Sequence, residues 1–127
     1  MENKKTILVV DDASLVRLYY RSTLEAAGFR VEEALNGIEA LEKLLSITAD
    51  LLIVDVNMPQ MDGFTLLDVL RQKDGPLAAT PALVTSTESA QSDFDAAYKA
   101  GANYYLVKPI DREKLVEFAA MLCGVPR

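Results

Sequence analysis

Four charged side chains of this sequence directly follow apolar runs: Asp11, Asp12, Asp55 and Lys108. The run Leu51–Val54 before Asp55 is continuously aliphatic, as is typical of a strand buried on both faces of a parallel sheet. Ligands of such sheets bind beyond the carboxyl ends of the strands. The sequence therefore predicts that three carboxylates and one ammonium group meet in a crevice at one edge of a sheet.

The chemistry of such a crevice is restricted by the residue types available. Three carboxylates repel one another, and a divalent cation with oxygen ligands, Mg²⁺ or Mn²⁺, would relieve that repulsion. Lys108 could then serve as a point charge for a phosphate oxygen. The chain contains no histidine, which excludes Ser-His-Asp and Cys-His catalysis and histidine metal sites. The one cysteine, Cys123, excludes an internal disulfide.

Composition sets the class of protein and its surroundings. The 127 residues are enough for one compact domain, and 50% of them are hydrophobic. The net charge of −6 disfavours nucleic acid as a direct partner, because phosphate binding needs clustered basic residues. No apolar stretch is long enough for a membrane span, and residues 1–5 do not begin a signal peptide, so we expect no membrane insertion and a cytoplasmic location.

The elements expected along the chain alternate between strand and helix. Helices are expected after each strand, with Ser14 and Asn36 as N-caps of the first two. Residues 73–81 are expected to form a loop. The predicted strands are 6–10, 30–34, 51–54, 82–85 and 104–107. This alternation predicts an α/β fold with helices on both faces of a five-stranded parallel sheet, as one domain over residues 1–127 with no output domain.

Four segments together resemble the response-regulator receiver family of two-component systems: Val9–Asp12, Val54–Gly63, Ala100–Ala102 and Lys108–Pro109. The resemblance covers residues 6–122 and is strongest to single-domain, CheY-like receivers of the chemotaxis kind. It implies a flavodoxin-like (βα)5 doubly wound fold in three α/β/α layers, with strand order 2-1-3-4-5. It also implies a phosphorelay signalling protein rather than an enzyme, although receivers promote their own Mg²⁺-dependent phosphorylation and dephosphorylation.

The resemblance further implies a role for each residue of the crevice. Asp55 would be the phosphoacceptor, taking a phosphoryl group from a phosphohistidine of a sensor histidine kinase or histidine phosphotransfer protein. The carboxylates Asp11, Asp12 and Asp55, with the backbone carbonyl of Asn57, would hold Mg²⁺. Lys108 would contact a phosphate oxygen, and its peptide bond to Pro109 would be cis.

Residues for switching and resetting are also implied by the resemblance. The switch hydroxyl falls on Ser86 when counted from Pro81 or Lys108, and on Thr85 when counted from Asp55; Ser86 is preferred. Tyr105 occupies the position of an aromatic that turns inward on activation, and its alternative is a half-exposed residue of the sheet. Asn57 and Glu88 would tune dephosphorylation. The alternative for Glu88 is an acid at the N-terminus of a helix, where the helix dipole favours negative charge.

One departure from the family and several alternatives bear on the function. Thr87 stands where receivers usually have Ala or Gly, and its size could narrow access to the phosphate. The signal is expected to leave through the face formed by the fourth helix, the fifth strand and the last helix, which would bind a target protein. The receiver itself is expected to be a monomer. The alternatives are a phosphate sink, a scaffold that binds partners without phosphorylation, or a flavin carrier or small phosphatase on a similar fold. Asp11-Asp12 suits neither a flavin phosphate nor an Asp-x-Asp phosphatase motif.

Overall fold

The computed structural model describes residues 4–126, so the predictions that include residues 1–3 and 127 extend outside the described residues. This part of the chain forms a five-stranded, wholly parallel sheet with the strand order β2-β1-β3-β4-β5. The elements follow one another as β1 (Thr6–Val10), α1 (Ser14–Ala26), β2 (Arg30–Ala34), α2 (Gly37–Lys43), β3 (Leu51–Asp55), α3 (Gly63–Arg71), the short 3-10 helix η1 (Gly75–Ala79), β4 (Ala82–Ser86), α4 (Gln91–Ala100), β5 (Tyr104–Val107) and α5 (Arg112–Cys123). The predicted flavodoxin-like fold class and strand order are confirmed.

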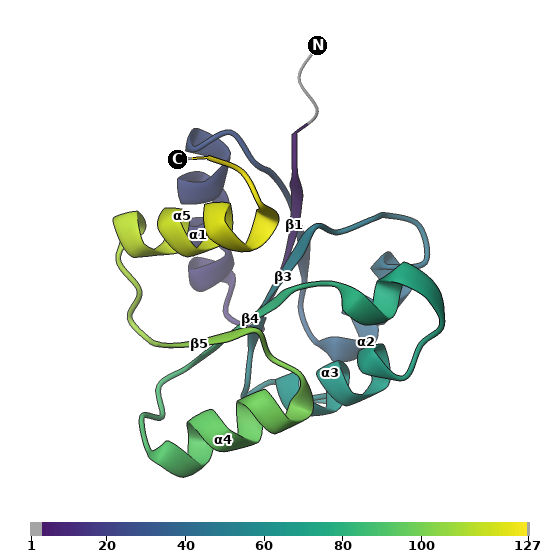
Figure 1. The fold of residues 1–127 in the computed structure, drawn as a ribbon. Coiled ribbons are helices and arrows are strands. Elements are labelled where there is room, and N and C mark those ends of the chain that lie inside the picture. Colours follow the sequence, from purple (N-terminus) through teal and green to yellow (C-terminus); the bar gives the residue numbers. More distant parts are fainter. Residues whose placement is uncertain (1–3, 127) are drawn as a thin grey trace.

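The helices form two layers that cover the two faces of the sheet. Helices α1 and α5 pack together on one face, and α2, α3 and α4 pack side by side on the other (Figure 1). Each face buries its own apolar cluster, and alternate residues of one strand contribute to both: Leu52 and Val54 face α3, whereas Leu51 and Ile53 face α1 and α5. Double burial explains why β3 is an uninterrupted aliphatic run.

The register of the strands brings the polar strand ends together. Val10 pairs with Val54 across β1 and β3, so Asp11 and Asp55 lie beside each other at the carboxyl edge. Asp55 pairs in turn with Thr85 of β4. The amide of Lys108 donates to the carbonyl of Ser86 at 2.7 Å, which places Lys108 at the same edge.

The helix ends agree with the sequence in part. Asn36, Asp62 and Asp111 accept a hydrogen bond from the third residue beyond them and cap α2, α3 and α5. The prediction for Ser14 is wrong: it is the first residue of α1, and Ala13 at the N-cap makes no side-chain bond. The amide of Ala13 instead donates to Asp11 Oδ1 at 2.9 Å.

The segment expected to be a loop also contains structure. Residues Gly75–Ala79 form the 3-10 helix η1, with Pro76 near its start, where a missing amide hydrogen costs nothing. The sequence predicts a helix from about Ser89 to Ala100, and in the structure α4 begins at Gln91. Across residues 4–126, no helix combines the length and apolar character needed to cross a bilayer.

Candidate functional site

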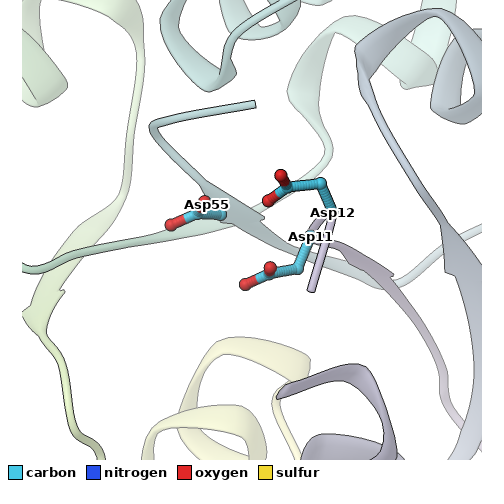
Figure 2. A group of neighbouring side chains, drawn as sticks. All are labelled: Asp11, Asp12 and Asp55. Carbon is cyan, nitrogen blue, oxygen red and sulfur yellow. The ribbon is translucent and has the colours of Figure 1, made fainter. Parts of the chain in front are cut away.

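The three predicted carboxylates meet at the carboxyl edge of β1 and β3. Asp11 is 1% exposed and Asp55 is 7% exposed, whereas Asp12 is exposed at the rim. One carboxylate oxygen from each residue lies within 4.8 Å of the other two. Figure 2 shows the three side chains projecting into the same small region. The crevice predicted from the strand ends is therefore present.

Lys108 joins this cluster from the end of β5. Its Nζ lies 2.9 Å from Asp11 Oδ2 and 2.9 Å from Asp55 Oδ1. Burial opposes the charge of this ammonium group, but hydrogen bonds and attraction from the two carboxylates outweigh it and raise the pKa of Lys108. Lys108 is therefore held as a cation between the two buried acids.

The charge state of Asp55 reflects a balance between burial and its neighbours. Burial raises the pKa of Asp55, and repulsion from Asp11 and Asp12 adds to that rise. The hydrogen bond and charge of Lys108 act in the opposite direction and offset only part of the rise. Additional positive charge in the crevice would therefore favour the ionised, nucleophilic form of Asp55.

The donor set of the cluster suits a hard divalent cation. Three carboxylates against one ammonium group leave two excess negative charges, which one divalent ion would balance. One carboxylate oxygen from each residue lies within 4.8 Å of the others, a spacing that allows one small cation to contact all three. Asp11, Asp12 and Asp55 could hold such an ion, and the backbone carbonyl of Asn57, also predicted as a ligand, stands two residues beyond Asp55.

The turn after β3 depends on a close approach between Gly63 and the backbone of Asp55. A Cβ at Gly63 would lie 2.5 Å from the carbonyl oxygen of Asp55, which is too close for any side chain. The amide of Gly63 also donates to the carbonyl of Val56 at 3.0 Å. Gly63 therefore lets α3 begin directly against the strand end that carries the candidate phosphoacceptor.

Arg17 is a positioning residue that the sequence did not reveal. Its guanidinium donates to the backbone carbonyl of Asp11 at 2.7 Å and to Glu33 Oε1 at 2.9 Å. Glu33 also accepts from Arg21 at 2.6 Å, and although burial opposes its charge, the two arginines lower the pKa of Glu33. This network ties α1 and β2 to the turn that carries Asp11. An arginine one helical turn after the acid pair was the available signal.

The predicted switch residues lie on both sides of the sheet. Ser86 is 1% exposed, and its Oγ accepts from the amide of Glu88 at 3.1 Å. Thr85, the alternative, is fully buried and follows Leu83 on the face covered by α1 and α5. Ser86 is the last residue of β4, and its role as the switch hydroxyl stays a prediction.

Tyr105 is buried, and so its alternative as a half-exposed residue does not describe this structure. It is 5% exposed, its hydroxyl donates to the carbonyl of Glu88 at 2.8 Å, and Phe94 packs edge-on at 4.6 Å between ring centroids. Its neighbour Tyr104 contacts Phe118 on the opposite face. Tyr105 thereby connects β5 to the chain segment between Ser86 and α4.

The remaining predicted residues lie at the exposed rim. Asn57, Thr87 and Glu88 are all exposed in loops at the carboxyl edge. The peptide bond between Lys108 and Pro109 is cis, as predicted. Cys123 is buried in the layer of α1 and α5, away from the carboxylates.

The chain folds as a doubly wound α/β domain with a cluster of three carboxylates, which could hold a cation, at the carboxyl edge of its sheet. A family model described as the response regulator receiver domain matches residues 7–120 of the chain. The chain belongs to the response regulator receiver family.

Chemotaxis proteins are among the relatives of the chain. It is 38% identical over 120 residues to the chemotaxis protein CheY1 of Helicobacter pylori, covering 93% of this chain and 96% of that protein. It is 38% identical over 112 residues to the chemotaxis protein CheY of Bacillus subtilis, covering 87% of this chain and 91% of that protein.

Solved structures agree with the fold in detail. The chemotaxis response regulator CheY4 of Vibrio cholerae superimposes with a TM-score of 0.87 at 34% identity, covering 94% of this chain and 99% of that one. A response regulator from Chloroflexus aurantiacus gives a TM-score of 0.89 at 35% identity, covering 96% of this chain and 99% of that one. The chain is therefore similar to CheY-like receivers over nearly all of its length.

Proposed function

We propose that the protein accepts a phosphoryl group on Asp55 from a phosphohistidine of a histidine kinase or phosphotransfer protein. The observation that carries this proposal is the ion pair of a half-buried lysine with two buried aspartates at adjacent strand ends. Such a pair costs desolvation energy and is not expected in a domain that needs only to fold. Catalytic use of the charges accounts for that cost.

In the proposed transfer, Asp55 Oδ2 attacks the phosphorus while Lys108 remains on Oδ1. The new O–P bond forms as the N–P bond of the phosphohistidine breaks, and the imidazole leaves with the bonding electron pair. Lys108 then offers its N–H groups to a phosphoryl oxygen, where charge increases during transfer. A divalent cation on Asp11, Asp12 and Asp55 would supply further neutralisation of the phosphoryl oxygens.

The output proposed for this chemistry is a change on the surface formed by α4, β5 and α5. The Ser86 hydroxyl would move to donate to a new phosphoryl oxygen. Because Ser86 Oγ accepts from the amide of Glu88, and Tyr105 donates to the carbonyl of Glu88, this movement would displace the segment from Ser86 to Glu88. A partner that prefers the changed surface would bind by a shift of population. The relatives named as chemotaxis proteins favour a target in that kind of signalling.

The lifetime of the phosphoryl group would be set at the rim of the crevice. Asn57 and Glu88 are exposed polar residues on the loops beside Asp55 and could orient an attacking water. Thr87 stands next to Ser86 and shares a cavity wall with Lys108. Its added bulk would slow access of both donor and water to the phosphoryl group.

The experiment is labelling with phosphoramidate and Mg²⁺, followed by separation of the phosphorylated form. Wild-type protein should take up one phosphoryl group per chain, and EDTA should prevent uptake. The variant Asp55→Asn keeps the shape of the side chain and should not be labelled, whereas Asp68→Asn on α3 is the matched control. Undiminished labelling of Asp55→Asn would refute the assignment, and failure of wild type to label under any donor would favour a scaffold without phosphorylation.

A further inference from the structure

A buried hydroxyl group beneath the crevice lacks a partner. Thr85 is 0% exposed, and its Oγ1 makes no hydrogen bond with any group of residues 4–126. Thr85 pairs with Asp55 in the sheet and follows Leu83 on the face covered by α1 and α5. An unsatisfied buried hydroxyl costs free energy, and a strand position of this kind accepts an apolar residue readily. The hydroxyl therefore calls for an explanation.

A tyrosine of α1 lies beside this hydroxyl. Tyr20 is 3% exposed, and burial raises its pKa to about 12. The charge of Lys108 and the hydroxyl of Thr85 act against burial and lower the pKa of the same phenol group. The spacing of Val16, Tyr20, Leu24 and Ala27 predicts only that Tyr20 lies on the apolar face of a helix, because such spacing says nothing about the end of its side chain.

Tyr20 and Lys108 line the same cavity, which leaves space for the phenol group and the ammonium group to approach each other. The cavity has a volume of about 630 Å³, lies between α1 and the connection from β5 to α5, and has Tyr20, Lys108 and Thr87 in its wall. The neighbouring Tyr19 also lines it, but its hydroxyl is already used, donating to the carbonyl of Ile110 at 2.8 Å. Tyr20 thus shares the wall of this cavity with Lys108, and its hydroxyl is not the one bonded to Ile110.

The ammonium group of Lys108 has a donor to spare. It carries three N–H groups, of which Asp11 and Asp55 take two at 2.9 Å each. When Asp55 becomes an acyl phosphate, its carboxylate charge is lost and the negative charge lies on the phosphoryl oxygens. A neutral acceptor on the α1 side would then keep the lysine in place while one N–H turns to the phosphoryl oxygen.

We propose that Tyr20, supported by Thr85, is a positioning residue for Lys108 in phosphoryl transfer. The phenol oxygen accepts the third N–H of Lys108, and the phenol O–H donates to Thr85 Oγ1. This arrangement gives the unpartnered hydroxyl of Thr85 a hydrogen-bond partner. It also holds the ammonium group of Lys108 from the side that faces the cavity. The inference rests on the proposed function of Asp55 and adds residues to that site.

The test compares single-turnover phosphorylation rates with phosphoramidate at saturating Mg²⁺. Tyr20→Phe retains the ring and removes the oxygen, and the loss of one hydrogen bond to a charged group predicts a rate about 10-fold lower. Thr85→Val should lower the rate about twofold, because the phenol O–H loses the acceptor that orients it. The matched control Tyr19→Phe, in the same cavity, should leave the rate unchanged.

A double-mutant cycle separates positioning from general damage. If Tyr20 acts through Lys108, then Tyr20→Phe should have no further effect on the rate in a Lys108→Met background. An equal fall in both backgrounds, or an unchanged rate for the single variant, would overturn the proposal. Failure of the wild-type protein to be labelled would instead refute the function of Asp55, so the two failures are distinguishable.

Discussion

The two edges of the sheet handle buried charge in opposite ways. At the carboxyl edge, Lys108 lies among three carboxylates, and the cluster keeps two excess negative charges. At the amino edge, the guanidinium of Arg71 faces backbone carbonyls, donating to Gly101 at 2.7 Å, Thr80 at 2.6 Å and Ala78 at 3.0 Å. Arg71 joins the end of α3 to the connections before β4 and β5.

This difference separates a site that stabilises the fold from a site that performs chemistry. Arg71 has its N–H groups matched to neutral acceptors, and although burial lowers its pKa, no titratable partner is drawn into the contact. The carboxyl edge holds mutually repelling groups and a raised pKa at Asp55. Imbalance of this kind is retained where a protein binds a ligand or ion, and rarely elsewhere.

The largest expected effect at the carboxyl edge follows from removing its ammonium group. Lys108→Met keeps most of the side-chain length and should lower the phosphorylation rate by about 100-fold, since a charged donor to the transferring group is lost. The rate is measured with phosphoramidate and Mg²⁺. Lys73→Met, in an exposed loop, is the control and should retain the wild-type rate. A rate within about threefold of wild type would remove Lys108 from the chemistry.

At the amino edge the corresponding change should act on stability and leave the chemistry intact. Arg71→Met leaves several carbonyls without a donor, and we expect a loss of about 3 kcal/mol in the free energy of unfolding. Urea denaturation measures this loss, with Arg30→Met on the exposed surface as the control. The folded fraction of Arg71→Met should phosphorylate at the wild-type rate. A slow rate in the fully folded variant would show that the two edges are coupled.

The smallest effect concerns the thiol of Cys123, which ends α5 near the amino edge of the sheet. Burial raises the pKa of Cys123 to about 11, and Asp50 nearby adds to the rise. The thiol form is thus favoured by folding: its contribution to stability is complete below pH 9.0, the ordinary value, and is lost as the pH rises through about 11. Cys123→Ala should therefore lose less stability than wild type over this interval.

Thiol labelling provides the direct check on Cys123. A disulfide reagent at pH 8 should react slowly with the native protein and quickly in urea, with or without Mg²⁺. Rapid reaction of the native protein would mean that the thiol is accessible, in conflict with its exposed fraction of 8%. Phosphorylation of Cys123→Ala should match wild type.

The sequence predicted those parts of the site that depend on local patterns. Apolar runs identify the strands, and since parallel strands end at one edge, Asp11, Asp55 and Lys108 could be placed together before any coordinates were known. Asn36 was also identified correctly, because an N-cap depends on residues three apart. The prediction for Ser14 failed because the helix begins one residue earlier than expected. The amide of Ala13, at the N-cap, donates to the carboxylate of Asp11 in the crevice.

Contacts between distant residues account for what the sequence did not reveal. Arg71 meets carbonyls of residues 7 to 30 positions away, and backbone acceptors leave no mark on residue type. The spacing of Tyr20 predicts a core residue, and its place in one cavity with Lys108 depends on how α1 lies against the connection from β5 to α5. The helix η1 was missed because Gly75 and Pro76 are equally typical of a loop.

The central claim is that Asp55 is the residue that carries the phosphoryl group. The most direct measurement treats the protein labelled by phosphoramidate and Mg²⁺ with borohydride, which reduces an aspartyl phosphate to homoserine, and locates the change by peptide mass spectrometry. The account predicts homoserine at position 55, with Asp11 and Asp12 unaltered. Homoserine at position 11 or 12, or a phosphate that borohydride does not release, would contradict it.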